Sequence, residues 1–178
     1  AGANEQIQVL PSQKQSYYHS YGGLNVKSDC FKKITYRNVY ENIDIEYVIP
    51  EEKENGIKYN VVMHPGADPS KIKIVYSGDV KKIIKRKNGE VQIETTLCPI
   101  IEHLPLSFTE DGNKVESEFS LTNNTIGFQF PKGYEKTKKL IIDPWVSLLT
   151  TLSTNNYGYD VDYDFAGNLY VFGGITTY

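Results

Sequence analysis

The sequence predicts an all-β fold whose larger part is an antiparallel, β-sandwich-like domain. Short runs of alternating apolar and polar residues recur along the chain, which is the period of two expected of half-buried strands. Glycine, asparagine and proline turn signals separate these runs. The 14 tyrosines, with abundant isoleucine, valine and threonine, are residue types that favour strands over helices.

Length and charge exclude several classes of protein. A chain of 178 residues can hold one domain with a proper core and part of another. A net charge of -3 argues against a nucleic-acid partner, which would need a strongly basic face. No apolar run approaches the roughly 18 residues that a membrane-spanning helix requires, so we expect no membrane span.

The first 35 residues are the least regular part of the chain. Ile7 and Val9 alternate with glutamines, which predicts one short strand. An aromatic cluster follows at Tyr17, Tyr18 and Tyr21. These rings, together with Trp145, are candidates for stacking on a saccharide. The other interpretation, which we favour, is an edge strand that covers the core.

Residues 36–76 predict three strands joined by two turns, and we expect the rest of the domain to be organised around them. Ile43, Ile45 and Tyr47 fall on one face of the first strand, and residues 57–61 repeat the pattern. Residues 72–76 repeat it again and predict the third strand.

A rigid corner is predicted between the second and third of these strands. Pro65 and Pro69 withhold backbone donors, and Gly66 permits a positive φ, so neither a helix nor a strand ladder can continue. Asp68 precedes a proline and is therefore held extended, which suits a side chain that folds back onto nearby backbone amides. We interpret this corner as structural rather than as a ligand site.

Three tight turns organise the chain that follows. Asn88-Gly89 between two alternating runs is the strongest hairpin signal in the sequence. A second turn is predicted at residues 111–113 and a third at Asn123-Asn124. The strand after the third turn has an apolar face that we expect to lie against the core, made of Ile126, Phe128 and Phe130.

The boundary of the larger domain is predicted near residue 146. Residues 140–142 form an apolar strand that Asp143-Pro144 stops, because proline blocks further pairing on one side. We therefore predict two units, a β-rich domain at residues 1–145 and a second unit at residues 146–178.

The second unit has the pattern of a strand, a Gly167-Asn168 turn and another strand. Asp160, Asp162 and Asp164 alternate along the first of these strands, so their carboxylates would share one face and could hold calcium. The spacing falls short of an EF-hand loop. We favour a role in capping the turn, and we expect no other cofactor.

Two parts of the central region resemble a known family. Val39-Tyr40-Glu41-Asn42-Ile43-Asp44 and Pro65-Gly66-Ala67-Asp68-Pro69-Ser70-Lys71-Ile72 are similar to the patterns V-Y-x-x-I-D and P-G-A-D-P-x-x-I. These patterns occur in the β-rich domain that precedes SBBP-type β-propeller repeats in large surface proteins of Bacteroidota. The resemblance implies that residues 1–145 begin within such a domain and that residues 146–178 are the start of a first propeller blade.

The same resemblance implies a location and partners. Such proteins are extracellular or attached to the cell surface, are exported by type IX secretion, and take part in gliding and adhesion. The expected partners are the downstream propeller and further domains of the same protein, components of type IX secretion, and other cell-surface proteins. A carbohydrate-binding module that contacts surface glycans is the alternative.

We find no catalytic pattern in the sequence and predict that the chain is not an enzyme. There is no G-x-S-x-G motif, and the glycine pairs lack a phosphate-binding context. Glu102 and His103 are neighbours on a predicted strand and therefore point to opposite faces. Cys30 and Cys98 are compatible with a disulfide in an exported protein and equally with two free thiols.

Overall fold

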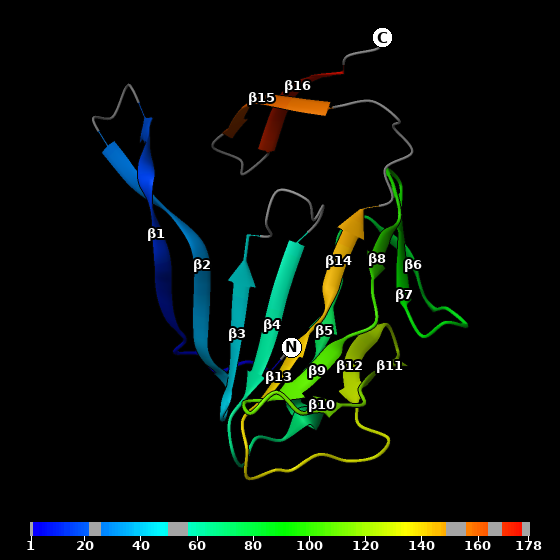
Figure 1. The fold of residues 1–178 in the computed structure, drawn as a ribbon. Helices are drawn as coiled ribbons and strands as arrows, with labels where there is room; N and C mark the ends of the chain where they lie inside the picture. Colours follow the sequence, from blue (N-terminus) through cyan, green and yellow to red (C-terminus); the bar gives the residue numbers. More distant parts are fainter. Residues whose placement is uncertain (1, 22–25, 50–56, 149–155, 164–168, 176–178) are drawn as a thin grey trace.

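The computed structural model describes residues 2–21, 26–49, 57–148, 156–163 and 169–175, and these residues form an all-β protein (Figure 1). Every strand pairing in these ranges is antiparallel. The only helical element in them is the short 3-10 helix η1 (Pro69–Lys71). The predicted fold class is therefore confirmed.

The largest sheet, which we call the main sheet, has eleven strands. Its central path runs β1-β2-β3-β4-β14-β8-β7-β6, and β13 pairs with both β4 and β9, while β10 pairs with β9. Its strands are β1 (Gln8–Tyr21), β2 (Val26–Tyr40), β3 (Ile43–Val48), β4 (Ile57–Met63), β6 (Val80–Lys85), β7 (Val91–Thr95), β8 (Ile100–Glu102), β9 (Leu106–Thr109), β10 (Lys114–Val115), β13 (Leu140–Asp143) and β14 (Trp145–Leu148).

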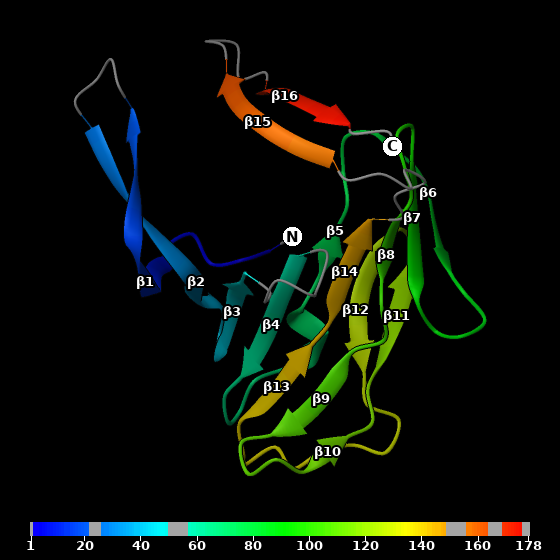
Figure 2. The same ribbon diagram turned by 45° about the horizontal axis from the view of Figure 1, so that its top comes forward.

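A smaller sheet packs against the main sheet and completes a sandwich-like core. Its three strands run in the order β11-β12-β5, from β11 (Glu118–Thr122), β12 (Thr125–Gln129) and β5 (Ile74–Val75). Figure 2 shows β11 and β12 as a layer separate from β4, β13 and β14. Phe119 and Ile126 of the smaller sheet share a buried cluster with Val61, Ile93 and Ile142 of the main sheet. Burial of these apolar side chains is the main stabilising contribution to the fold.

The predicted hairpins are present. Residues 80–85 and 91–95 pair across Asn88-Gly89, and Gly89 has the positive φ of +90° that this tight turn needs. Residues 118–122 and 125–129 pair across Asn123 and Asn124, which both have a positive φ. Along β12, Ile126 and Phe128 are buried, as their alternation predicts, and Phe130 after the strand is half-buried.

The corner after β4 is also present, and it has the predicted backbone conformation and side-chain hydrogen bond. Asp68 is extended, with φ of -103° and ψ of 107°, and its Oδ1 accepts a hydrogen bond of 3.0 Å from the backbone N–H of Ser70. Gly66 has a positive φ of 84°. Pro69 begins η1, where its missing N–H costs nothing.

The prediction of three consecutive strands around this corner was only partly right. The third strand is the two-residue β5, and it pairs with β12 of the smaller sheet instead of with β4. Ile72, the expected start of the third strand, is the C-terminal cap of η1. The corner therefore moves the chain from one sheet to the other, which the alternating pattern alone does not indicate.

The N-terminal hairpin is much longer than the short strand predicted near Ile7. Strands β1 and β2 have 14 and 15 residues, and Figure 1 shows their far ends extending beyond the rest of the sheet. Most described side chains of β1 are exposed, and Pro11 is tolerated because β1 is an edge strand.

The C-terminal part of the described chain begins inside the main sheet. β14 lies between β4 and β8, so the sheet continues through the position at which the sequence predicts the domain boundary. Beyond it, β15 (Asn156–Tyr163) and β16 (Leu169–Ile175) pair as a separate two-stranded sheet. The two predicted strands of this unit are present, and the predicted turn at Gly167-Asn168 lies outside the described residues. The assignment of these strands to a propeller blade remains a prediction. No helix in the described ranges has the length and apolar character that a membrane crossing requires.

Candidate functional site

Glu102 and His103, at the end of β8, are the centres of two separate groups of titratable and polar residues. Glu102 is fully buried, whereas the side chain of His103 remains partly exposed. The backbone N–H of His103 donates to the carbonyl of Trp145 at 2.9 Å, which joins the chain after β8 to β14. The prediction that Glu102 and His103 point away from each other agrees with their separate sets of partners.

Glu102 and two tyrosines form what we call the buried cluster. The Tyr59 hydroxyl donates to Oε2 of Glu102 at 3.2 Å, and the Tyr76 hydroxyl donates to Oε1. Tyr59 comes from β4, and Tyr76 follows β5, so the cluster joins the main sheet to the strand that enters the smaller sheet. Buried carboxylates are commonly held in this way, because an unsatisfied one would be very costly.

Burial sets the protonation behaviour of this cluster. Removal from water raises the pKa of the Glu102 carboxyl, and the hydrogen bonds from Tyr76 and Tyr59 oppose that rise. Burial and the nearby Glu102 also hold the pKa of Tyr59 well above its ordinary value, and they raise the pKa of Tyr76 in the same way. Both phenols are therefore neutral donors at physiological pH.

A cavity of about 380 Å³ lies beside the buried cluster. Glu102, Tyr59 and Tyr76 are part of its wall. The remaining wall is mainly apolar and aromatic, although Lys73 is also part of it, and it includes Tyr40, Ile45, Tyr47, Ile74, Ile100 and Val146. Its size falls in the range of roughly 300–1,000 Å³ that is typical of small-molecule sites.

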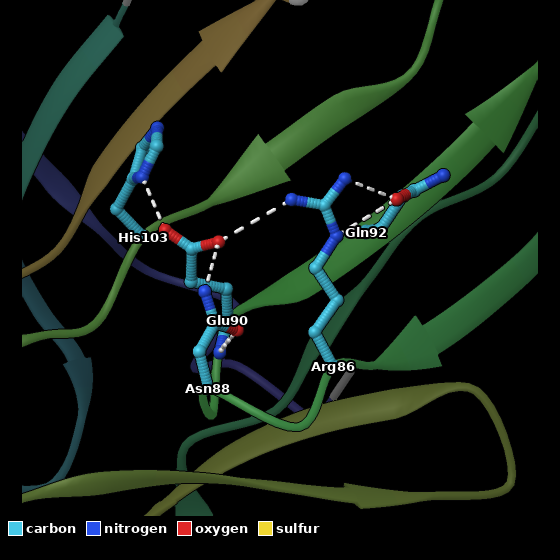
Figure 3. A network of polar contacts seen from close by, with 5 residues as sticks. All are labelled: Arg86, Asn88, Glu90, Gln92 and His103. Carbon is cyan, nitrogen blue, oxygen red and sulfur yellow. Dashed lines mark hydrogen bonds and ion pairs between the residues drawn. The ribbon is translucent and has the colours of Figure 1, made fainter.

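On the other side of β8, five polar residues form what we call the hairpin network (Figure 3). Glu90, in the turn between β6 and β7, accepts a hydrogen bond of 2.8 Å from Asn88 Nδ2. Its Oε1 lies 2.7 Å from Nδ1 of His103. Arg86 reaches Glu90 through Nη1 at 3.4 Å and Gln92 through Nε at 2.9 Å.

The net pKa shift of Glu90 is opposite to that of Glu102, because hydrogen bonds and charge outweigh the effect of burial at Glu90. The hydrogen bond from Asn88 is the largest cause that holds the pKa of the Glu90 carboxyl below its ordinary value. The hydrogen bond from His103 and its positive charge when protonated add to this lowering. The network fastens the Asn88-Gly89 turn to the chain after β8.

Trp145 belongs to a second, smaller hollow. Its ring stacks on His103, with the ring centroids 4.5 Å apart and the planes at 20°. The hollow has a volume of about 230 Å³, and Lys58, Leu104, Leu106 and Asp143 also line it. One face of the indole is thus covered by the histidine rather than presented to solvent.

The aromatic residues predicted for saccharide stacking are not brought together. Tyr17 and Tyr18 of β1 are 56% and 51% exposed, which agrees with an edge strand but not with a cover over the core. Nζ of Lys27 lies 4.6 Å above the Tyr18 ring. Strands β2, β3 and β4 separate them from Trp145 on β14. The side chain of Tyr21 lies outside the described residues.

The predicted metal and turn residues of the second unit lie largely outside the described part of the chain. Asp164, Gly167 and Asn168 are not described, and of Asp160 and Asp162 only the backbone in β15 is. In the ranges whose side chains the structure describes, no three His, Cys, Asp or Glu residues are grouped as a metal ion would require. Cys30 and Cys98 are both free thiols, so the disulfide alternative is not realised.

The remaining predicted motif residues have structural positions. Pro65, Gly66, Asp68 and Pro69 form the corner before and at the start of η1. Asp143 ends β13 and lies 3.6 Å from Lys58, with Oδ2 and Nζ as the two atoms. Pro144 is buried between β13 and β14. The stop at Asp143-Pro144 therefore separates two strands of one sheet.

The buried cluster is the feature that the sequence interpretation missed. Tyr59 was in phase with the inward residues of its strand, and Tyr76 was in phase with Ile72 and Ile74. This alternation with inward-facing residues indicates that both tyrosine side chains point toward the interior. Their meeting with Glu102 depends on the pairing of distant strands, which the sequence pattern does not specify.

The fold and these sites define a two-layered antiparallel β domain with a buried carboxylate between its sheets. The chain belongs to the family described as "Domain of unknown function (DUF7948)", whose match covers residues 1–145. Searches among curated proteins and among solved structures gave no match.

Proposed function

We propose that the chain is a non-catalytic structural and adhesive module of a large secreted or cell-surface bacterial protein, in which it caps a following β-propeller. The observation that carries this proposal is the position of β14. This last strand of the main sheet lies at the centre of its path, between β4 and β8, and not at an edge.

A central strand is a firm attachment for whatever follows it in the chain. Val146 is paired with Ile57 on one side and with Glu102 on the other. Pulling β14 out would break two ladders and would uncover Val146, which is 9% exposed. A module that supports a downstream domain needs such an anchor at its exit.

The acid–base residues also support a structural role, because each of them is engaged within the fold. Glu90 and His103 contact each other, and Glu102 accepts hydrogen bonds from two tyrosines. The separation of Tyr17 and Tyr18 from Trp145 favours the structural module over the alternative carbohydrate-binding module. The surface location and the export by type IX secretion rest on the resemblance of the V-Y-x-x-I-D and P-G-A-D-P-x-x-I motifs.

The test uses the natural polypeptide that contains this chain. Its intact mass and a peptide map are expected to show further blade repeats after Tyr178. Calorimetry of the same polypeptide with Val146→Asp in β14 is expected to lower the melting temperature of the following domain as well as that of the sandwich. A polypeptide without such repeats, or a downstream domain that melts unchanged, would refute the capping role.

A further inference from the structure

The cavity beside the buried cluster is lined by residues of both sheets of the sandwich. On β3, Ile43 is fully buried, Ile45 is half-buried and Tyr47 is 45% exposed, so burial falls steadily along one face of the strand. The smaller sheet contributes Ile74 and Val75 of β5 to the opposite wall. Tyr47, the exposed member of this series, is part of the cavity wall.

The carboxyl group in this cavity is unusual because its hydrogen-bond partners are neutral hydroxyls, although Lys73 is also part of the cavity wall. Glu102 is fully buried, and its hydrogen-bond partners among the described residues are the hydroxyls of Tyr59 and Tyr76. No lysine or arginine in the described ranges forms an ion pair with it. An ionised carboxylate in an apolar wall is costly unless an opposite charge accompanies it.

Aromatic rings surround the same space. Tyr40, Tyr47, Tyr59 and Tyr76 all line the cavity, and the Tyr47 and Tyr59 rings lie 6.3 Å apart between centroids. The faces of such rings attract cations through their electron density, most strongly where water is excluded. A carboxylate among tyrosine rings is the combination of groups that recognises organic ammonium ions.

We propose that this cavity binds a small organic ammonium ion with an apolar body. The ammonium group would donate to Glu102 and lie against the tyrosine rings, and the apolar body would contact Ile45, Ile74 and Val146. An anionic ligand is disfavoured because Glu102, when ionised, would repel it. A highly hydroxylated ligand such as a sugar is disfavoured by the apolar wall, which could not satisfy its hydroxyl groups.

Three probes of equal length test the proposal on the full chain: octylammonium, octanol and octanoate. Isothermal titration calorimetry at neutral pH is expected to show saturable binding of octylammonium, at least about tenfold weaker binding of octanol, and no binding of octanoate. Chemical-shift changes in NMR spectra are expected at the amides of Ile45, Tyr47 and Ile74. Equal affinity for octylammonium and octanoate, or no saturable binding of octylammonium at millimolar concentration, would overturn the proposal.

Glu102→Gln is the decisive variant, because it removes the charge and keeps the shape of the side chain. It is expected to weaken octylammonium binding at least about tenfold and to leave octanol binding unchanged. The matched control is Glu46→Gln on β3, whose carboxylate pairs with Lys33 at 2.6 Å and is not part of the cavity wall. That control is expected to bind all three probes as the wild type does. Unchanged octylammonium affinity in Glu102→Gln would overturn the proposal; if circular dichroism shows that this variant does not fold, the comparison of probes on the wild-type chain decides.

Discussion

The buried cluster and the hairpin network use the same residue type on the two sides of β8 in opposite ways. Glu102 is held by neutral hydroxyls away from water, and burial raises its pKa. Glu90 is held by Asn88, His103 and Arg86 at a turn, and these partners lower its pKa. The contrast shows that the position of a glutamate in the sandwich decides whether its carboxyl group has a raised or a lowered pKa.

The largest expected effect is a loss of stability in the buried cluster. Tyr59→Ala should lower the free energy of unfolding by about 4 kcal/mol, because it empties a core position that is 8% exposed and removes a donor from Glu102. Urea denaturation followed by circular dichroism measures this loss. Arg86→Ala in the hairpin network is the matched truncation, and it should cost less than about 1 kcal/mol. Similar losses for the two variants would remove the energetic distinction between the two regions.

An intermediate effect is expected at the turn of the hairpin network. Gly89 has a φ of +90°, and an added Cβ would lie 2.9 Å from Cδ2 of Leu104. Gly89→Ala should therefore destabilise the chain by about 2 kcal/mol, from backbone strain and the collision together. Gly112→Ala has a similar φ of +83° and open space around the new Cβ, so it should cost only about 1 kcal/mol.

Thermal or urea unfolding of the two glycine variants separates the backbone contribution from the contact with Leu104. Adding Leu104→Ala to Gly89→Ala should bring the cost of the glycine change down to that of Gly112→Ala. If Leu104→Ala leaves the stability loss of Gly89→Ala unchanged, the turn is not in close contact with Leu104.

The smallest effect is the dependence of stability on pH, and its sign differs between the two carboxylates. The raised pKa of Glu102 gives a contribution that is complete below its ordinary value of 4.5 and is lost as pH rises through the folded-state pKa. The lowered pKa of Glu90 gives a contribution that is present above 4.5 and is lost as pH falls through the folded-state pKa.

Urea unfolding between about pH 3 and pH 8 should therefore distinguish Glu102→Gln from Glu90→Gln. The first variant should lose less stability than the wild type as pH rises, and the second should lose less as pH falls. Superimposable pH profiles for the two variants would show that the two environments do not act on the carboxylates in opposite directions.

Features that depend on neighbouring residues could be predicted from the sequence. The Asn88-Gly89 hairpin requires only a few consecutive residues, and so does the N-terminal cap of η1, in which Asp68 accepts a hydrogen bond from the Ser70 N–H. Both are present. The alternation along β12 identified Ile126 and Phe128 as inward-facing for the same reason. In each case the local backbone preference and the burial pattern favoured the same structure.

Features that depend on the pairing of distant strands could not be predicted. Alternation showed that residues 72–76 are extended, but not that β5 would join β12 in the other sheet. It placed Tyr59 and Tyr76 on inward faces without bringing either hydroxyl to Glu102. The length of the β1–β2 hairpin was missed because most described side chains of β1 and the first four residues of β2 are exposed, so they carry little period-two signal.

The central position of β14 also constrains the order in which the molecule can fold. Lys58 is synthesised well before its partner Trp145, so the gap between β4 and β8 stays open until β14 has been made. Pairings between residues so far apart in sequence form slowly. A chain that emerges progressively from a ribosome or a secretion pore would thus complete its main sheet only after nearly all of the domain has come out.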